Sequence, residues 1–94
     1  MLKSFRHKGL KKFAEDGCTS GIDQQHAKNL RLQLTVLSAA TSIDDLRTVP
    51  KSWKLHPLKG EHEGTWSLTV KENWRLTFKF DGNDVILLNY EDYH

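Results

Sequence analysis

The chain has 94 residues, 37% of them hydrophobic and 28% charged, which suits one domain over residues 1–94 and excludes a disordered chain. Its longest apolar run, Val85–Leu88, is far shorter than the roughly 20 residues of a membrane-spanning helix, and no apolar stretch typical of a secretory signal follows the N-terminus. The single Cys18 excludes an internal disulfide and a multi-cysteine zinc site, so we expect a cytoplasmic protein with no membrane association.

The first half of the chain predicts mainly helices. In chain order we expect a short strand over residues 2–5, helices over residues 8–16 and about 23–40, and a helical turn over residues 42–46. Gly17 is placed to end the first helix, and Ser20 or Asp23 can cap the second. The second helix has an apolar stripe with a helical spacing, formed by Ala27, Leu30, Leu34 and Leu37.

The second half predicts strands, because the apolar period changes to two. The expected strands cover residues 53–56, 65–70, 74–80 and 84–90, with tight turns at 71–73 and 81–83. The continuous apolar run in the last strand predicts that both of its faces are covered. The fold class is therefore α+β, with the helices packed on one face of a twisted antiparallel sheet. The other face is polar enough to bind a ligand, since it carries Thr65, Ser67, Thr69, Arg75, Thr77 and Lys79.

Histidines near the expected sheet are the candidates for proton transfer, because imidazole titrates near neutral pH. His94 ends the chain directly after Asp92 and Tyr93, and a buried strand leading to it would hold this end in place; a solvated tail is the alternative. His56 ends an expected strand beside the loop that presents Lys59, and an ordinary surface histidine is the alternative there. A metal site built from these histidines and His62 is not expected, because their spacing does not fix a ligand geometry.

The remaining candidates have structural interpretations. His7 and His26 precede expected helices and are read as surface residues, and Cys18 is read as a structural thiol. Residues 1–60 carry eleven Lys or Arg and five Asp or Glu, whereas residues 61–94 carry three and seven. This basic first part indicates a polyanionic partner contacted by one face, with an ordinary solvated surface as the alternative.

Five segments together resemble one family. These are Ser4–Phe13, His26–Arg31, Leu55–Gly60, Asn73–Phe78 and Asn89–His94. The chain resembles the HigB toxins, or plasmid-maintenance killer proteins, within the RelE-like family of bacterial ribonuclease toxins. The resemblance extends over essentially the whole chain, and the terminal Asp-Tyr-His is its most specific element. It implies a RelE-like microbial ribonuclease fold, with an N-terminal helical hairpin packed on the sheet.

The resemblance also implies a function and a set of site residues. The implied function is a ribosome-dependent endoribonuclease that cleaves mRNA, inhibits translation and growth, needs no metal or cofactor, and is neutralised by a HigA-like helix-turn-helix antitoxin. The implied catalytic residues are His56, Asp92, Tyr93 and His94, and Lys59 and Arg75 would contact the phosphate. Contacts with the 70S ribosome are expected from Lys8, Lys11, Lys12, Lys28 and Arg31. A non-catalytic ribosome-binding or RNA-binding module of the same fold is the alternative.

Overall fold

The computed structural model describes residues 1–92, with all side chains in that range except His62. Its helices are α1 (Lys8–Asp16) and α2 (Ala27–Ala39), and its strands are β1 (His56–Pro57), β2 (Trp66–Lys71), β3 (Trp74–Asp81) and β4 (Asp84–Asp92). Four 3₁₀ turns, η1 to η4, occur within this range at Gln24–His26, Ile43–Leu46, Lys51–Trp53 and Gly60–His62. Within residues 1–92, no helix has both the length and the apolar character to cross a membrane.

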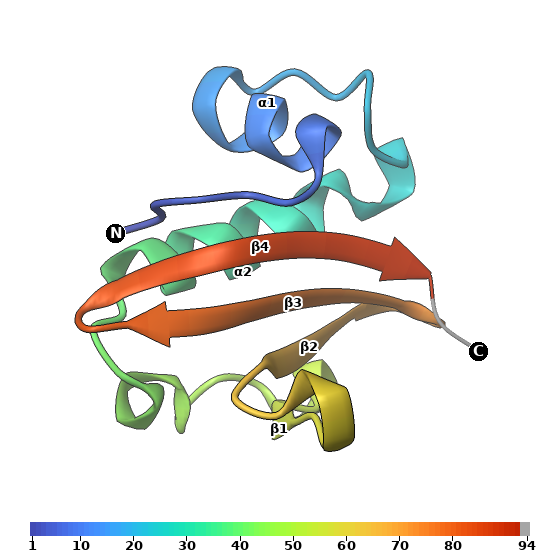
Figure 1. Ribbon diagram of the computed structural model, residues 1–94. Helices are drawn as coiled ribbons and strands as arrows, with labels where there is room; N and C mark the ends of the chain where they lie inside the picture. Colours follow the sequence, from blue (N-terminus) through green and yellow to red (C-terminus); the bar gives the residue numbers. More distant parts are fainter. Residues whose placement is uncertain (93–94) are drawn as a thin grey trace.

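The four strands form one antiparallel sheet in the order β1-β2-β3-β4 (Figure 1). The first residues of the chain run parallel to β4 and pair with it through bridges at Leu2–Val85 and Phe5–Leu88. The expected opening strand is therefore reduced to two bridges, which extend the sheet beyond β4. This pairing fixes the N-terminal segment before α1 begins.

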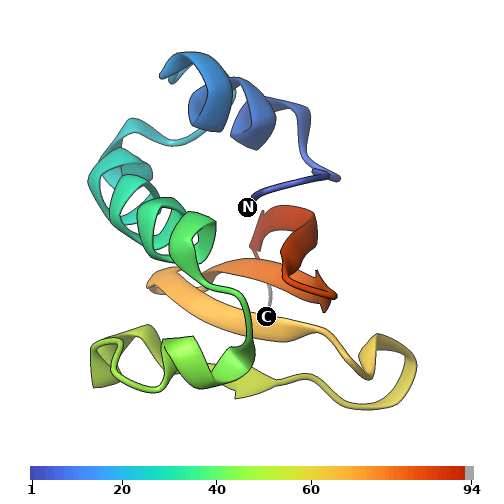
Figure 2. The ribbon, with the colours of Figure 1, turned by 90° about the vertical axis from the view of Figure 1, so that its left-hand side faces the viewer.

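Both helices pack on one face of the sheet, and α2 lies to one side of it in Figure 2. The shared core is formed by leucines of the two helices and apolar residues of the strands, among them Leu10, Leu30, Leu37, Leu68, Leu76, Phe78 and Leu88. The predicted α+β architecture is confirmed. The predicted ends of the first helix are also confirmed: Gly17 has the left-handed φ of 74° and donates its N–H to Phe13 O, which closes α1.

Three expectations about the strands and histidines are wrong. Residues 53–56 do not form a strand, because Trp53 ends a 3₁₀ turn and Lys54 has a φ of 49°; only His56 and Pro57 pair with β2. The last strand is not covered on both faces, since 39% of Leu87 is exposed. His26 is not a surface residue, since only 4% of it is exposed.

His26 belongs to an aromatic cluster that joins distant parts of the chain. Its Nδ1 lies 2.5 Å from the Tyr90 hydroxyl, which also accepts a 3.4 Å hydrogen bond from the Asp23 N–H. The Tyr90 ring stacks on Trp74. The His7 and Tyr90 rings form a T-shaped pair with a centroid distance of 5.4 Å. The cluster therefore connects η1 and the start of α1 to strands β3 and β4.

A second close contact joins α1 to the loop before η1. A Cβ built on Gly9 would lie 2.3 Å from Gly21 O, and one built on Gly21 would lie 2.5 Å from Gly9 Cα. Only two glycines permit the two backbones to approach this closely.

We expect Gly9→Ala to destabilise the protein, although alanine is the better helix former by about 1 kcal/mol. The added methyl would meet a backbone oxygen, so the net loss should be about 1–3 kcal/mol, visible as a lower midpoint of thermal unfolding followed by circular dichroism. Lys11→Ala, at an exposed position of the same helix, is the control and should change the midpoint little. A higher midpoint for Gly9→Ala would show that the two backbones are not in contact.

A second prediction concerns pH. Burial raises the pKa of the Tyr90 phenol above its ordinary value of 10.0, against the opposing effect of the Asp23 N–H. As the pH rises above about 10, the unfolded phenol ionises first, so the native state holds more protons and the free energy of unfolding falls. Tyr90→Phe should lack this decrease in the free energy of unfolding, and urea unfolding of both proteins between about pH 9 and 11 measures it. Parallel pH profiles for the two proteins would contradict it.

Candidate functional site

The face of the sheet away from the helices carries a row of polar residues. The strand register aligns His56 with Ser67, Ser67 with Thr77, and Thr77 with Asn89, so one row crosses all four strands. Directly opposed residues of antiparallel strands share a face. Ser67 is 1% exposed and Thr77 is 5% exposed, although both are polar. The predicted polar face therefore exists, and part of it is buried.

A cavity of about 210 Å³ opens on this face. It is bounded by the sheet, by the N-terminal segment and by the loop between β1 and β2, through the residues Arg6, Leu58, Glu61, Thr65, Thr77, Lys79, Leu87, Asn89 and Glu91. The Leu58 N–H donates to Thr65 O at 2.8 Å, which continues the pairing of β1 with β2 and joins the two ends of that loop. The chain around residues 60–64 projects on the side opposite α2 (Figure 2). The cavity therefore combines hydroxyl, amide and charged groups with two leucines.

A β-bulge places Leu87 in this cavity. The register between β3 and β4 shifts between Thr77 and Lys79, and Leu87 has a left-handed φ of 56°. Its N–H donates to Ser4 Oγ at 2.9 Å, so the N-terminal segment supports the bulge. A branched residue in this conformation is strained, and such strain is typical of functional sites.

Arg75 and Glu91 form an ion pair on the same face. They are directly opposed in the register, and Arg75 Nε and Nη2 both lie 2.9 Å from Glu91 Oε1. The arginine side chain is 16% exposed and the glutamate 38%. Glu91 was not among the residues selected from the sequence. Strict alternation in β4 could have found it, because Asn89 and Glu91 are two residues apart.

His56 is exposed, and its tautomer follows from its neighbour. Nδ1 lies 2.6 Å from Lys54 O, and a carbonyl oxygen can only accept, so Nδ1 carries the proton. In the neutral ring, Nε2 is then left with a lone pair that can accept a proton. Lys59 is also exposed and lines a neighbouring cavity of about 430 Å³ with Leu58 and Trp66.

The structure does not bring His56 and Asp92 together. They belong to the two outer strands of the four-stranded sheet, about three strand spacings of 4.8 Å apart. Asp92 is opposite Trp74, whose ring contacts His26, and therefore lies on the helix-covered face by register. The other two residues of the implied catalytic set, Tyr93 and His94, lie outside the described residues.

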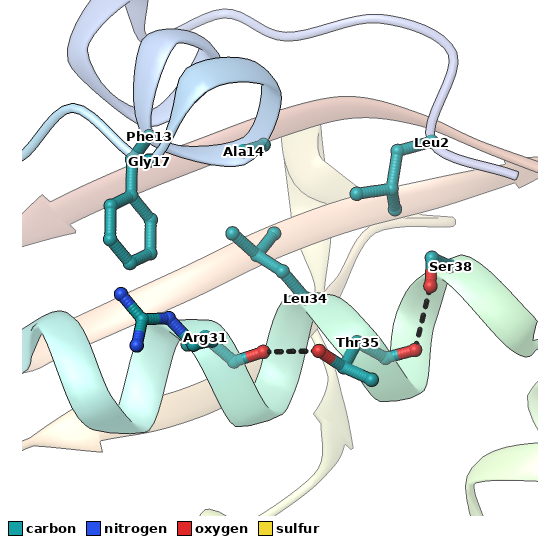
Figure 3. A pocket seen from close by; sticks show the side chains of 8 residues that line it. All are labelled: Leu2, Phe13, Ala14, Gly17, Arg31, Leu34, Thr35 and Ser38. Atoms are coloured by element: carbon teal, nitrogen blue, oxygen red, sulfur yellow. Dashed lines mark hydrogen bonds between the residues drawn. The ribbon is translucent and has the colours of Figure 1, made fainter.

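All five residues expected to contact the ribosome are exposed, and all belong to helices. Lys8, Lys11 and Lys12 are on α1, and Lys28 and Arg31 are on α2. The Arg31 guanidinium lies over the Phe13 ring at 5.7 Å, beside a cavity of about 330 Å³ between the two helices (Figure 3). These cations therefore lie apart from the polar face of the sheet.

The Arg75–Glu91 pair should contribute measurably to stability, because two charge-assisted hydrogen bonds form in a half-buried position. A double-mutant cycle with Arg75→Ala and Glu91→Ala, measured by urea unfolding, should give a coupling energy of about 1 kcal/mol. The exposed Arg47–Asp44 pair, which has the same 2.9 Å separation, is the control and should give less than about 0.5 kcal/mol. Equal coupling in the two cycles would show that burial adds nothing to the first pair.

Comparisons with known proteins show the family and the fold of this chain. A family model described as RelE-like toxin of type II toxin-antitoxin system HigB matches residues 3–94. The Endoribonuclease HigB of Proteus vulgaris is 50% identical over 94 residues, which is 100% of both chains. Two solved structures share the fold: YafQ from E. coli (TM-score 0.63, 17% identity, 98% of this chain and 93% of that one) and a YoeB/ParE toxin from Agrobacterium tumefaciens (TM-score 0.62, 12% identity, 100% of both). The chain therefore belongs to the HigB family of RelE-like toxins of type II toxin-antitoxin systems.

Proposed function

We propose that this protein is an endoribonuclease that cleaves mRNA on the translating ribosome and thereby inhibits growth, with residues 1–94 acting as one domain. The observation that carries the proposal is the helix-free polar face, which carries Arg75 and His56 and also a cavity with hydroxyl, amide and charged groups in its lining. The full-length similarity to a protein named Endoribonuclease HigB supports the same activity. Since its substrate would be mRNA bound to ribosomes, the toxin would act in the cytoplasm.

RNA supplies its own nucleophile, the 2′-OH beside each phosphate, so no metal ion or cofactor is needed. The enzyme must provide a base for this hydroxyl, a cation for the phosphate and an acid for the leaving 5′-oxygen. His94 or Asp92 would accept the 2′-OH proton, and Tyr93 would stack on the nucleotide or hydrogen-bond to it. The product is a 2′,3′-cyclic phosphate and a 5′-hydroxyl.

Arg75 would stabilise the charge that develops on the phosphate, with Lys59 as a second cation. Arg75 and His56 share a face, two strand spacings apart across the sheet and two residues apart along it, or about 12 Å between their Cα atoms, so their side chains can approach one phosphate from two sides. With its Nδ1 proton held by Lys54 O, His56 has Nε2 available as the acid when protonated, or as a second phosphate contact. Glu91 holds the Arg75 guanidinium in place and must share it with the substrate.

The cations of the helices would dock on ribosomal RNA through phosphate contacts, which weaken with salt. The ribosome would orient the mRNA on the polar face, so free RNA would be cleaved poorly. We further propose that a HigA-like helix-turn-helix antitoxin neutralises the toxin. Antitoxin complexes occur among proteins of this fold, for example the YoeB-YefM complex from Staphylococcus aureus (TM-score 0.60, 21% identity, 100% of this chain and 98% of that one).

One observation favours a second candidate, a ribosome-binding or RNA-binding module without catalysis. His56 and Asp92 lie on opposite faces by register and at opposite edges of the sheet. Such a module would inhibit translation by occupying the ribosome, with no cleaved mRNA ends and no requirement for His94.

We expect His94→Ala to lower mRNA cleavage by about 10²–10⁴-fold, the usual contribution of a general acid or base. Primer extension on mRNA from ribosomes programmed in vitro, with EDTA present, measures the cleavage, and growth after induction provides the second readout. The midpoint of thermal unfolding and the binding to ribosomes should be unchanged in the variant.

The same experiment separates the two candidates. If the wild type arrests growth without producing cleaved mRNA ends, and His94→Ala arrests growth as well, the protein is the non-catalytic module. Cleavage that EDTA abolishes and zinc restores would contradict the metal-free mechanism. His56→Ala, measured in parallel at several pH values, shows whether this imidazole transfers a proton or only binds phosphate: loss of one limb of the pH profile indicates proton transfer.

A further inference from the structure

The cavity on the polar face is lined by hydroxyl and amide groups from neighbouring parts of the sheet, namely Thr65, Thr77 and Asn89. Ser67 Oγ is buried without a hydrogen-bond partner in the row next to Thr77, and Thr77 lines the cavity. Among residues 1–92, no side-chain hydrogen bond engages the Asn89 amide, which lines the cavity beside Thr77. Asn89 is half-buried, so a ligand that enters the cavity can form hydrogen bonds with its amide and with the Thr77 hydroxyl.

The charged groups that line the cavity are of both signs. Two cations, Arg6 and Lys79, line it together with two carboxylates, Glu61 and Glu91. Glu91 is already paired with Arg75, so Arg6, Lys79 and Glu61 remain, with a net charge of only +1. This small charge does not by itself select a phosphate, and the hydroxyl and amide groups of the lining fit an uncharged group with donors and acceptors.

The walls of the cavity suit a flat ring. Leu58 and Leu87 both line it, and Leu87 keeps its side chain there at the cost of a left-handed backbone. Leucine side chains can pack against the faces of a heterocycle while an amide or hydroxyl bonds to its edge. Apolar walls combined with hydroxyl and amide groups suit the recognition of single-stranded RNA, because unstacked bases are bound by their faces and edges.

We propose that this cavity binds one nucleobase of the RNA substrate and that Asn89 reads the edge of that base. The inference rests on the proposed ribonuclease function and adds a specificity-determining residue to it. The Asn89 amide offers one donor and one acceptor side by side, a pair that distinguishes bases by their edges. Thr77 supports the same edge from the neighbouring strand, and Leu87 covers the ring.

The test maps cleavage sites across a pool of mRNAs on ribosomes for wild type and for Asn89→Ala. Wild type should show a base preference at one position next to the cleaved bond, and Asn89→Ala should reduce that preference by at least about fivefold while the remaining cuts spread over other bases. Asn89→Asp, which keeps the shape but only accepts hydrogen bonds, should change which base is preferred. Asn83→Ala, an asparagine in an exposed turn, is the matched control and should cut the same sites as wild type.

Unchanged base preferences in Asn89→Ala and Asn89→Asp would overturn the proposal. Should Asn89→Ala prove unfolded, Thr77→Val removes a second edge contact at nearly constant volume, and an unchanged preference in that variant would overturn the proposal equally. If the wild type cleaves no RNA, the result contradicts the proposed ribonuclease function itself, and the inference about Asn89 is overturned with it.

Discussion

One extra residue in β4 decides which side chains of this strand face the core. Strand residues alternate between faces, and a bulge changes the alternation by one. Val85, before the bulge, is buried in the core, and so are Leu88 and Tyr90, after it. The side chains of Leu87, Asn89 and Glu91 line the cavity on the polar face. Without the bulge, a strand with Val85 in the core would turn Leu87, Asn89 and Glu91 inward as well, burying an amide and a carboxylate. The core and the candidate site therefore depend on the same backbone irregularity.

The N-terminal segment maintains this irregularity. Ser4 accepts two hydrogen bonds from β4, one from the Leu87 N–H through its side chain and one from the Leu88 N–H through its carbonyl. The same segment supplies Arg6 to the cavity and His7 to the start of α1, where His7 Nδ1 accepts from the Leu10 N–H. The first residues thus connect the helix layer to the polar face.

The sequence predicted features that depend on neighbouring residues and missed those that depend on distant ones. The helix over residues 8–16 and its glycine cap are local, and so are the two hairpin turns. The burial of His26 depends on Tyr90, 64 residues away, and no local pattern indicates it. The run Val85–Leu88 resembles a doubly covered strand because a bulge leaves no mark in composition.

The sequence also predicted only part of the candidate site. Arg75 was placed on the polar face from alternation alone, and the structure confirms that placement. The grouping of Asp92 with His56 came from family resemblance, and the register places the two at opposite edges and on opposite faces of the four-stranded sheet. The partner of Arg75, Glu91, was missed because it looks like one more charge in an acidic tail.

Charge is distributed unevenly between the first part of the chain, which contains the helices, and the part that contains β2 to β4. The segments up to residue 60, which include both helices, carry a net charge of +6, and the remainder, which contains β2 to β4, carries −4. The helices α1 and α2 carry a net charge of +3, so part of the long-range attraction to a polyanion comes from the helix layer, whereas the cavity has charges of both signs and Arg75 is already paired. Under the proposed function, a protein with this distribution would bind a large structured RNA through its helices before its sheet holds a single strand. The weak electrostatics of the polar face then restrict cleavage to RNA that another body positions there, which is the physical basis of dependence on the ribosome under the proposed function.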